Sequence, residues 1–359
     1  MNIDLLKRLC ETPGVPAHEG RVRELIRSEI EGLFDRVEED PMGNLICYRQ
    51  PRSPGKAKPR KDKKGETPTR VMLLCHMDEI GFLVSHIDDK GYLWLSPVGG
   101  FDTRNLFSRR VRVCGHGGDL LGVLNAGGRP THIASAEDRK KVPEVKEFFV
   151  DLGLEPASVR ERVRVGDPVV LEEPLIEIGD KIVSKALDNR VACWLGIEAV
   201  RQLAAGPEGH AAEVVVAFTV QEEVGLRGAR TASFAVRPDI GLGLDVTLSC
   251  DTPGVPESER VTVQGQGFGL HLKDSSFIAD PALAEDLAQL AEARQIPYQR
   301  TILAAGGQDG AAAQQAAAGA RAVGIVVGTR YIHTVTEMIH RRDLEAARDI
   351  IAAYLASVA

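Results

Sequence analysis

Apolar positions follow two different periods along the chain, and together they predict a mixture of helices and strands. Positions 22, 25, 26, 30 and 33 are apolar at spacings of three and four, which predicts an amphipathic helix after Gly20. Strands are expected at residues 45–48, 71–75, 181–186, 213–220, 240–246, 260–272, 301–304 and 322–327. Further helices are expected at 190–203, from Asp280-Pro281, from about Asp309, and from Leu344 to Val358. This alternation is typical of an α/β fold.

The stretch from residue 82 to 178 has a different pattern. Short β-prone runs, FLVSHI, YLWLSPV, RRVRVCG and DPVVLEE, are separated there by Gly, Pro and Asp. We therefore expect a catalytic domain whose first part covers residues 1–80, an inserted β-rich domain at 81–179, and the rest of the catalytic domain at 180–359. A chain of 359 residues is also longer than one hydrophobic core usually organises.

Composition and charge narrow the class of protein. Hydrophobic residues make up 43% of the chain and charged residues 26%, which is the ordinary balance of a globular protein. The N-terminal MNIDLLKRLC carries charges within a short apolar patch, so we expect neither a secretory signal nor a membrane span, and a cytoplasmic location. The six cysteines form no CxxC pair and are expected to be reduced and mostly buried.

A net charge of −7 disfavours nucleic acid as a partner. The basic segment 52–64 is the local exception, but it contains no aromatic residue. Because nucleic-acid surfaces of this kind combine cations with stacking aromatics, we interpret the segment as a solvated, disordered loop.

Acids and histidines stand at the ends of several predicted strands. Open α/β sheets place their ligand sites at the carboxyl ends of strands, so these side chains are expected to meet. Each alone is explained by an ordinary strand end, a solvated turn or a helix N-cap, but their joint placement indicates one site. The residues are His76 and Asp78 after strand 71–75, Asp188 after 181–186, Glu222 and Glu223 after 213–220, Asp245 at the end of 240–246, and His333 after 322–327.

This set of side chains predicts a centre for two metal ions. Imidazole and carboxylate groups are good zinc ligands, and a bridging carboxylate holds two ions roughly 3.5–4 Å apart. Our hypothesis is that His76 and Asp245 bind one ion, Glu223 and His333 bind the other, and Asp188 bridges them.

Two further acids have proposed roles beside the metals. Asp78 is close enough to His76 to accept a hydrogen bond from its unligated ring nitrogen, and Glu222 is assigned as the general base. The AAGGQDG segment at 304–310 lacks the lysine of a phosphate-binding loop. We expect it near the active site, with Gly307 and Asp309 at the substrate and Asp309 also capping the next helix.

These motifs carry a family resemblance. The chain resembles the glutamyl aminopeptidase family of dinuclear zinc metallopeptidases, which includes the tetrahedral aminopeptidases, in the segments HMDEIGF, VGG at 98–100, KALDNR, EEVGLRGA, GLDVT, RYIHT and TEMI. The resemblance implies a phosphorylase/hydrolase-like, three-layer catalytic domain interrupted by a β-barrel-like dimerisation domain. It also implies two zinc or cobalt ions per subunit, short peptides as substrates, and homo-oligomers from dimer to dodecamer.

Carried over by motif, the family's metal ligands fall on His76, Asp188, Glu223, Asp245 and His333, and its general base falls on Glu222. The chain departs from the family pattern at residues 51–66, which contain the basic segment and look like an insertion, and at Gln308, where family members more often have Thr.

Two alternative functions remain open at this stage. A metal site does not determine which groups of the substrate lie beyond the bond that is cleaved. A related hydrolase such as an N-acyl deacetylase, a carboxypeptidase or an endoglucanase is therefore an alternative. A non-catalytic assembly protein that keeps the fold is the second alternative. The intact base Glu222 and the complete ligand set favour an enzyme that removes N-terminal residues from short peptides.

Overall fold

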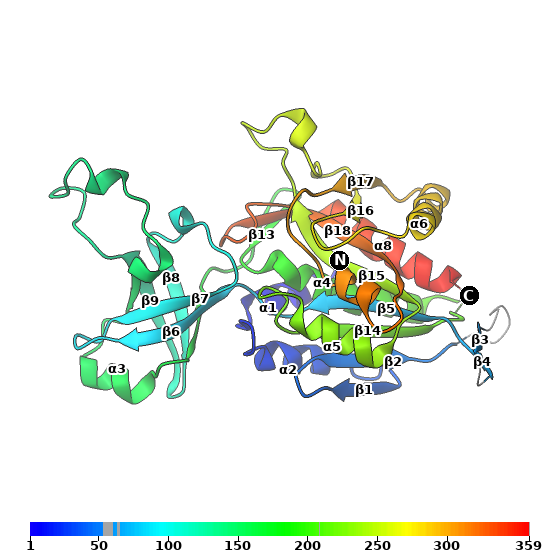
Figure 1. The fold of residues 1–359 in the computed structure, drawn as a ribbon, viewed down its shortest axis with the longest axis horizontal. Helices are drawn as coiled ribbons and strands as arrows, with labels where there is room; N and C mark the ends of the chain where they lie inside the picture. Colours follow the sequence, from blue (N-terminus) through cyan, green and yellow to red (C-terminus); the bar gives the residue numbers. More distant parts are fainter. Residues whose placement is uncertain (53–59, 63–64, 208, 359) are drawn as a thin grey trace.

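The computed structural model describes residues 1–52, 60–62, 65–207 and 209–358. It has a large body built on a sheet with helices on both faces, and a smaller barrel beside it (Figure 1). The basic segment 52–64 lies outside the described residues except for Arg52 and residues 60–62, so the expected disordered loop stays a prediction. Among the described residues, no helix combines the length and the apolar character needed to cross a membrane.

An eleven-stranded sheet forms the centre of the large body. Its main path runs β1-β2-β14-β5-β15-β18-β19-β13-β12, and β16 and β17 continue from β18. The four strands β14, β5, β15 and β18 are parallel to one another. The bounds are β1 Arg36–Glu39, β2 Leu45–Arg49, β5 Arg70–His76, β12 Ile176–Ile178, β13 Lys181–Ser184, β14 Glu213–Thr219, β15 Ile240–Leu248, β16 Phe268–Lys273, β17 Tyr298–Ile302, β18 Arg321–Arg330 and β19 Glu337–His340. A separate hairpin pairs β3 Arg60–Asp62 with β4 Gly65–Thr67.

Both faces of this sheet are covered by apolar helix residues. Successive residues of β5 alternate between two cores: Leu73 and Cys75 belong to the larger core, and Met72 and Leu74 belong to the smaller one. Helices α1, α2, α4, α6 and α8 contribute to the larger core, and α5 and α7 contribute to the smaller. Their bounds are α1 Ile3–Glu11, α2 Gly20–Glu29, α4 Leu187–Ala205, α5 Arg227–Val236, α6 Pro281–Arg294, α7 Gly310–Gln315 and α8 Arg341–Ser357. The predicted three-layer α/β fold is confirmed.

The smaller body is a closed six-stranded barrel in the order β10-β7-β6-β11-β8-β9. Its core is separate from that of the sheet and contains Phe82, Leu93, Val111 and Phe148. The strands are β6 Gly81–Ile87, β7 Leu93–Val98, β8 Arg109–Gly115, β9 Gly118–Ala126, β10 Phe148–Asp151 and β11 Pro168–Leu171, with α3 Pro156–Arg162 and the short helices η1 Thr103–Asn105, η2 Asp138–Lys140 and η3 Val145–Glu147 between them. The barrel-like insertion is confirmed, while the domain boundaries at 80 and 180 stay predictions.

One predicted strand is much shorter than its apolar pattern indicates. The strand expected at 260–272 begins only at Phe268, because Gly265 and Gly267 have φ values of +87° and +97° and their N–H groups donate to Asp343 rather than to a neighbouring strand. A short helix, η4 Glu257–Glu259, precedes this turn.

All six cysteines are free and four of them are buried, as expected.

Candidate active site

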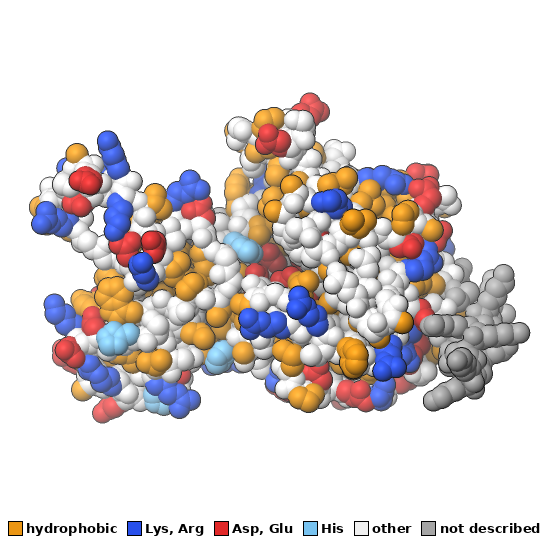
Figure 2. All heavy atoms as spheres, in the orientation of Figure 1, with side chains coloured by type: hydrophobic (Ala, Val, Ile, Leu, Met, Phe, Trp, Pro, Cys, Tyr) orange, Lys and Arg blue, Asp and Glu red, His pale blue; other side chains and the backbone are white. Residues whose placement is uncertain are grey.

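The predicted site residues meet at one edge of the central sheet. His76 is the last residue of β5, and Glu222 and Glu223 follow β14. Because β5, β14, β15 and β18 run in the same direction, the segments that follow them converge. Asp245 differs slightly from expectation, since β15 continues to Leu248 and places it within the strand. Figure 2 shows acidic side chains at the base of a hollow between the barrel and the large body.

Asp188 lies between the two histidines. Its Oδ1 is 3.4 Å from Nε2 of His76, and its Oδ2 is 3.4 Å from Nε2 of His333. Ala186, with a left-handed φ of 55°, ends the stretch after β13 and directs the chain into α4, whose first turn carries Asp188. One carboxylate that faces an imidazole with each oxygen has the geometry required of a bridging ligand.

The other predicted ligands complete one continuous cluster. Oε2 of Glu223 is 3.5 Å from Nε2 of His333, and Oε2 of Glu222 is 3.7 Å from Nε2 of His76. Two triplets have ligand atoms within 4.8 Å of one another, namely His76, Asp188 and Glu223, and His76, Glu222 and Asp245. The structure thus brings together all five predicted ligands and the predicted base.

The electrostatics of this cluster fit bound cations. Burial raises the pKa of Glu222, Glu223 and Asp245 well above the ordinary carboxyl range. Oε1 of Glu223 is buried and has no hydrogen-bond partner among the described residues. With Asp188, the cluster holds four carboxylates against two imidazoles, and two divalent cations would balance four negative charges. The donor set of carboxylate oxygens and imidazole nitrogens suits zinc or cobalt.

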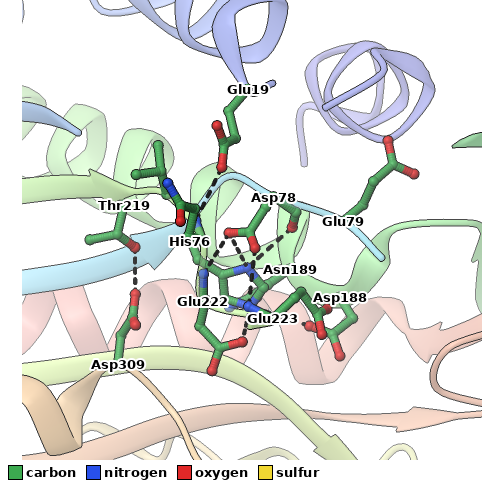
Figure 3. A network of polar contacts seen from close by, with 12 residues as sticks. Glu19, His76, Asp78, Glu79, Asp188, Asn189, Thr219, Glu222, Glu223 and Asp309 are labelled. Atoms are coloured by element: carbon green, nitrogen blue, oxygen red, sulfur yellow. Dashed lines mark hydrogen bonds and ion pairs between the residues drawn. The ribbon is translucent and has the colours of Figure 1, made fainter. Parts of the chain in front are cut away.

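Asp78 holds the backbone of the two adjacent glutamates. Its Oδ1 accepts from the N–H of Glu222 and its Oδ2 from the N–H of Glu223, each at 3.0 Å (Figure 3). Nδ1 of His76 lies 3.1 Å from the Asp78 carbonyl oxygen and 3.4 Å from its Oδ1. This leaves Nε2 of His76 facing the cluster. Asp78 therefore contacts both His76 and the backbone of the two glutamates, whereas the sequence predicted only its contact with His76.

Glu337 is a residue that the sequence interpretation missed. It lies at the start of β19, is 2% exposed, and accepts from the backbone N–H of Asp188 at 2.9 Å and of His333 at 2.8 Å. Burial, followed by the charge of Asp188, raises its pKa to about 8. Its place within the TEMI segment, one residue after RYIHT, was the available signal. Glu337 orients the backbone of two ligands, as Asp78 does for the glutamates.

A cavity of about 720 Å³ opens above the acids and histidines. Its remaining lining is mainly apolar, from Leu226, Val246, Leu248, Leu303 and Ile332, together with Ser276, Arg230 and the Ala305–Gly307 turn. A Cβ added to Gly307 would lie 2.8 Å from Oγ of Ser276, so glycine keeps this wall open.

Asp309 does not line this cavity. It is 2% exposed, its Oδ2 accepts from the hydroxyl of Thr219 (Figure 3), and its side chain makes no capping bond although it stands at the N-cap of α7. The predicted cap is therefore wrong: Oδ2 pairs with Thr219, and Oδ1 is buried without a hydrogen-bond partner among the described residues. Burial raises the pKa of Asp309 to about 6. The substrate roles of Gly307 and Asp309 stay predictions, and the geometry favours only the first.

Comparison with known proteins decides the family. The family model described as M42 glutamyl aminopeptidase matches residues 59–350. The chain belongs to the M42 glutamyl aminopeptidase family. A relative, the lysyl aminopeptidase of Pyrococcus furiosus, is 29% identical over 348 residues, which cover 95% of this chain and 93% of that protein.

Solved structures agree with the M42 assignment over the whole length. An aminopeptidase from the archaeon Desulfurococcus kamchatkensis is similar at a TM-score of 0.89, with 33% identity and coverage of 99% of this chain and 94% of that one. The TET1 peptidase of Pyrococcus horikoshii, which can assemble into a tetrahedron or a large octahedral shell, is similar at 0.85, with 29% identity and 99% coverage of both chains. The predicted family and fold are confirmed, and this M42 protein is a peptidase.

Proposed function

We propose that this protein is an aminopeptidase that depends on two divalent metal ions and removes N-terminal residues from short peptides. The observation that carries the proposal is the placement of Asp188, with one carboxylate oxygen 3.4 Å from each of His76 and His333. In this proposal His76 and Asp245 bind one ion, Glu223 and His333 bind the other, and Asp188 bridges them. Zinc is the preferred ion, and cobalt is the alternative.

The chain's own residues supply the proton transfers and the positioning. When bound, the two ions would acidify the attacking water and stabilise negative charge on the carbonyl oxygen of the scissile bond. Glu222, whose carboxylate faces His76 at 3.7 Å, takes the proton from the water and returns it to the leaving amine. Asp78 fixes the backbone of Glu222, and Gly307 leaves room for the peptide in the cavity wall.

The test of this proposal is hydrolysis of a panel of aminoacyl-p-nitroanilides, with N-acetylated forms of the same compounds as controls. An aminopeptidase is expected to cleave only compounds with a free amine, and the panel then ranks the preferred N-terminal residue. Cleavage of the N-acetylated compounds would instead support a deacetylase or another related hydrolase. Cleavage of none, with metal bound, would support a non-catalytic assembly protein.

We expect Asp188→Asn to lower the number of tightly bound zinc ions from two to about one or none, because the amide nitrogen of asparagine is a donor and cannot ligate a cation. Metal analysis after gel filtration measures this. Asp274→Asn is the matched control, since Asp274 is also a buried aspartate beside a histidine, His271 at 3.3 Å, but lies outside the proposed ligand set. Two ions retained by Asp188→Asn would rule out the bridging role.

The assembly and location of the protein are also proposals. The barrel lies within residues 81–179, which we propose to be a domain that mediates homo-oligomers, from dimer to dodecamer. The assembly of the TET1 peptidase into a tetrahedron or a large octahedral shell supports this. Light scattering after size exclusion gives the subunit number. We further propose a cytoplasmic protein with neither nucleic acid nor membrane as a partner.

A further inference from the structure

Four consecutive backbone N–H groups beside the site donate to side-chain oxygens rather than to backbone. Val220 donates to Oδ1 of Asn44 at 3.0 Å, and Gln221 donates to Oε1 of Glu19 at 3.1 Å. The next two, of Glu222 and Glu223, donate to Asp78. Figure 3 shows Glu19 and Asp78 approaching this segment from two sides.

The local backbone explains why side chains are needed here. Strand β14 ends at Thr219, whose pairing with His76 is the last of the ladder with β5. Beyond it the chain turns sharply, since Gln221 has a left-handed φ of 57° and the carbonyl of Glu222 accepts from residues 225 and 226. A buried N–H group without a partner costs about 1–3 kcal/mol, so acceptors from elsewhere in the fold stabilise this turn.

Glu19 and Asn44 are themselves fixed by several contacts. Oε1 of Glu19, at the start of α2, also accepts from the N–H of Ala17 at 2.9 Å, and the residue is 2% exposed. Asn44 is 0% exposed and donates to the carbonyl oxygen of Gly228 at 3.0 Å. A Cβ at Gly228 would lie 2.3 Å from Oδ1 of Asn44, so this close packing requires the glycine of the GLRGA segment.

Neither residue belongs to the cluster described above. In the described part of the chain, the cavity lining includes neither Glu19 nor Asn44, and both come from the segment before residue 45. Their hydrogen bonds act on the backbone of residues 220 and 221, directly before the two glutamates. Adjacent glutamates direct their carboxylates to different partners, His76 for Glu222 and His333 for Glu223, only if the torsions of this turn are held.

We propose that Glu19 and Asn44 are positioning residues, which hold the turn at residues 220–223 so that Glu222 points at the attacking water. The inference rests on the proposed role of Glu222. A displacement of about 1 Å in a catalytic group can lower the rate about 100-fold, so loss of one of these hydrogen bonds is expected to lower kcat by about 10–100-fold with little change in KM.

The test compares three substitutions of Glu19 in the full-length, zinc-loaded protein. Glu19→Gln keeps an acceptor oxygen of the same reach but removes the charge, and it is expected to keep kcat within about threefold of wild type. Glu19→Asp keeps the charge but withdraws the oxygen by one methylene, and Glu19→Ala removes it. Both are expected to lose about 10–100-fold in kcat while two zinc ions stay bound, because Asp78 still holds Glu223.

Asp343→Ala is the matched control. Asp343 is also fully buried and accepts from two backbone N–H groups, of Gly265 at 2.7 Å and Gly267 at 2.8 Å, but it lies outside the cavity lining described above. It is expected to lower the melting temperature and leave kcat within about threefold. A second readout needs no turnover: amide hydrogen exchange at residues 220–223 should accelerate in Glu19→Ala and Glu19→Asp, and only at 265–267 in Asp343→Ala.

Three outcomes would overturn the inference. In the first, Glu19→Ala loses stability like Asp343→Ala but keeps its kcat. In the second, the order of activities is reversed, with Glu19→Asp active and Glu19→Gln impaired, so that charge and not the hydrogen bond matters. In the third, Glu19→Ala or Glu19→Asp loses a bound zinc ion. Failure of the proposed function itself is distinguishable, because wild-type protein would then leave free-amine substrates uncleaved.

Discussion

Replacing Glu222 by glutamine is expected to lower kcat by about 10²–10⁴-fold while two metal ions remain bound. Glutamine has the shape of glutamate, and its backbone N–H can still donate to Asp78, so the site should keep its geometry. The glutamine side chain, however, cannot accept the proton of the attacking water. Initial rates on the preferred aminoacyl-p-nitroanilide, with metal analysis of the same samples, measure both quantities.

Glu24→Gln serves as the control for this substitution. Glu24 lies on α2, where its side chain is 67% exposed and pairs with Arg27 at 3.7 Å, and the change should leave turnover as in wild type. Unchanged turnover in Glu222→Gln would remove Glu222 from the mechanism. Loss of one ion in that variant would instead assign it to the metal ligands, in place of the general base.

The second large effect concerns stability. Glu79→Gln is expected to lower the free energy of unfolding by about 3–5 kcal/mol, because it leaves two buried cations without their anion. Oε2 of Glu79 lies 2.6 Å from Nζ of Lys185, and its Oε1 lies 3.4 Å from Nη2 of Arg190. These side chains are between 0% and 4% exposed, so water cannot replace the lost carboxylate. Denaturant unfolding of metal-stripped protein measures the change without the contribution of metal binding.

The matched control is an exposed ion pair. Arg36 and Glu38 form one on β1, with side chains 54% and 45% exposed, and Glu38→Gln should change stability by less than about 1 kcal/mol. Equal effects of the two substitutions would show that the charge of Glu79 contributes no more than a surface pair.

The sheet and most of the site were predictable because they depend on local patterns. Continuous apolar runs such as residues 71–75 are typical of strands covered on both faces, and acids or histidines that follow several such parallel strands lie at the same edge of the sheet. The positions of His76 and of the adjacent glutamates followed from this argument alone. The family resemblance added the barrel architecture, which weak β-prone runs do not specify.

The parts that were missed depend on contacts distant in sequence. Hydrogen bonds to backbone N–H groups are made by Glu337, Glu19 and Asn44. Neither the period of hydrophobic residues nor the spacing of polar residues predicts such bonds. The capping role expected of Asp309 failed for the same reason, since its partner Thr219 is 90 residues away. Polar side chains that hold irregular backbone can therefore be identified only from the structure. Polar side chains that follow regular strands can be identified from the sequence.

The most direct test of the two-metal account is a titration of zinc or cobalt into chelator-stripped protein, followed by hydrolysis of a free-amine substrate. The account predicts no cleavage without metal and full activity only when two equivalents per chain are bound, as the bridging geometry of Asp188 requires. Full activity at one equivalent, or activity in stripped protein, would contradict it.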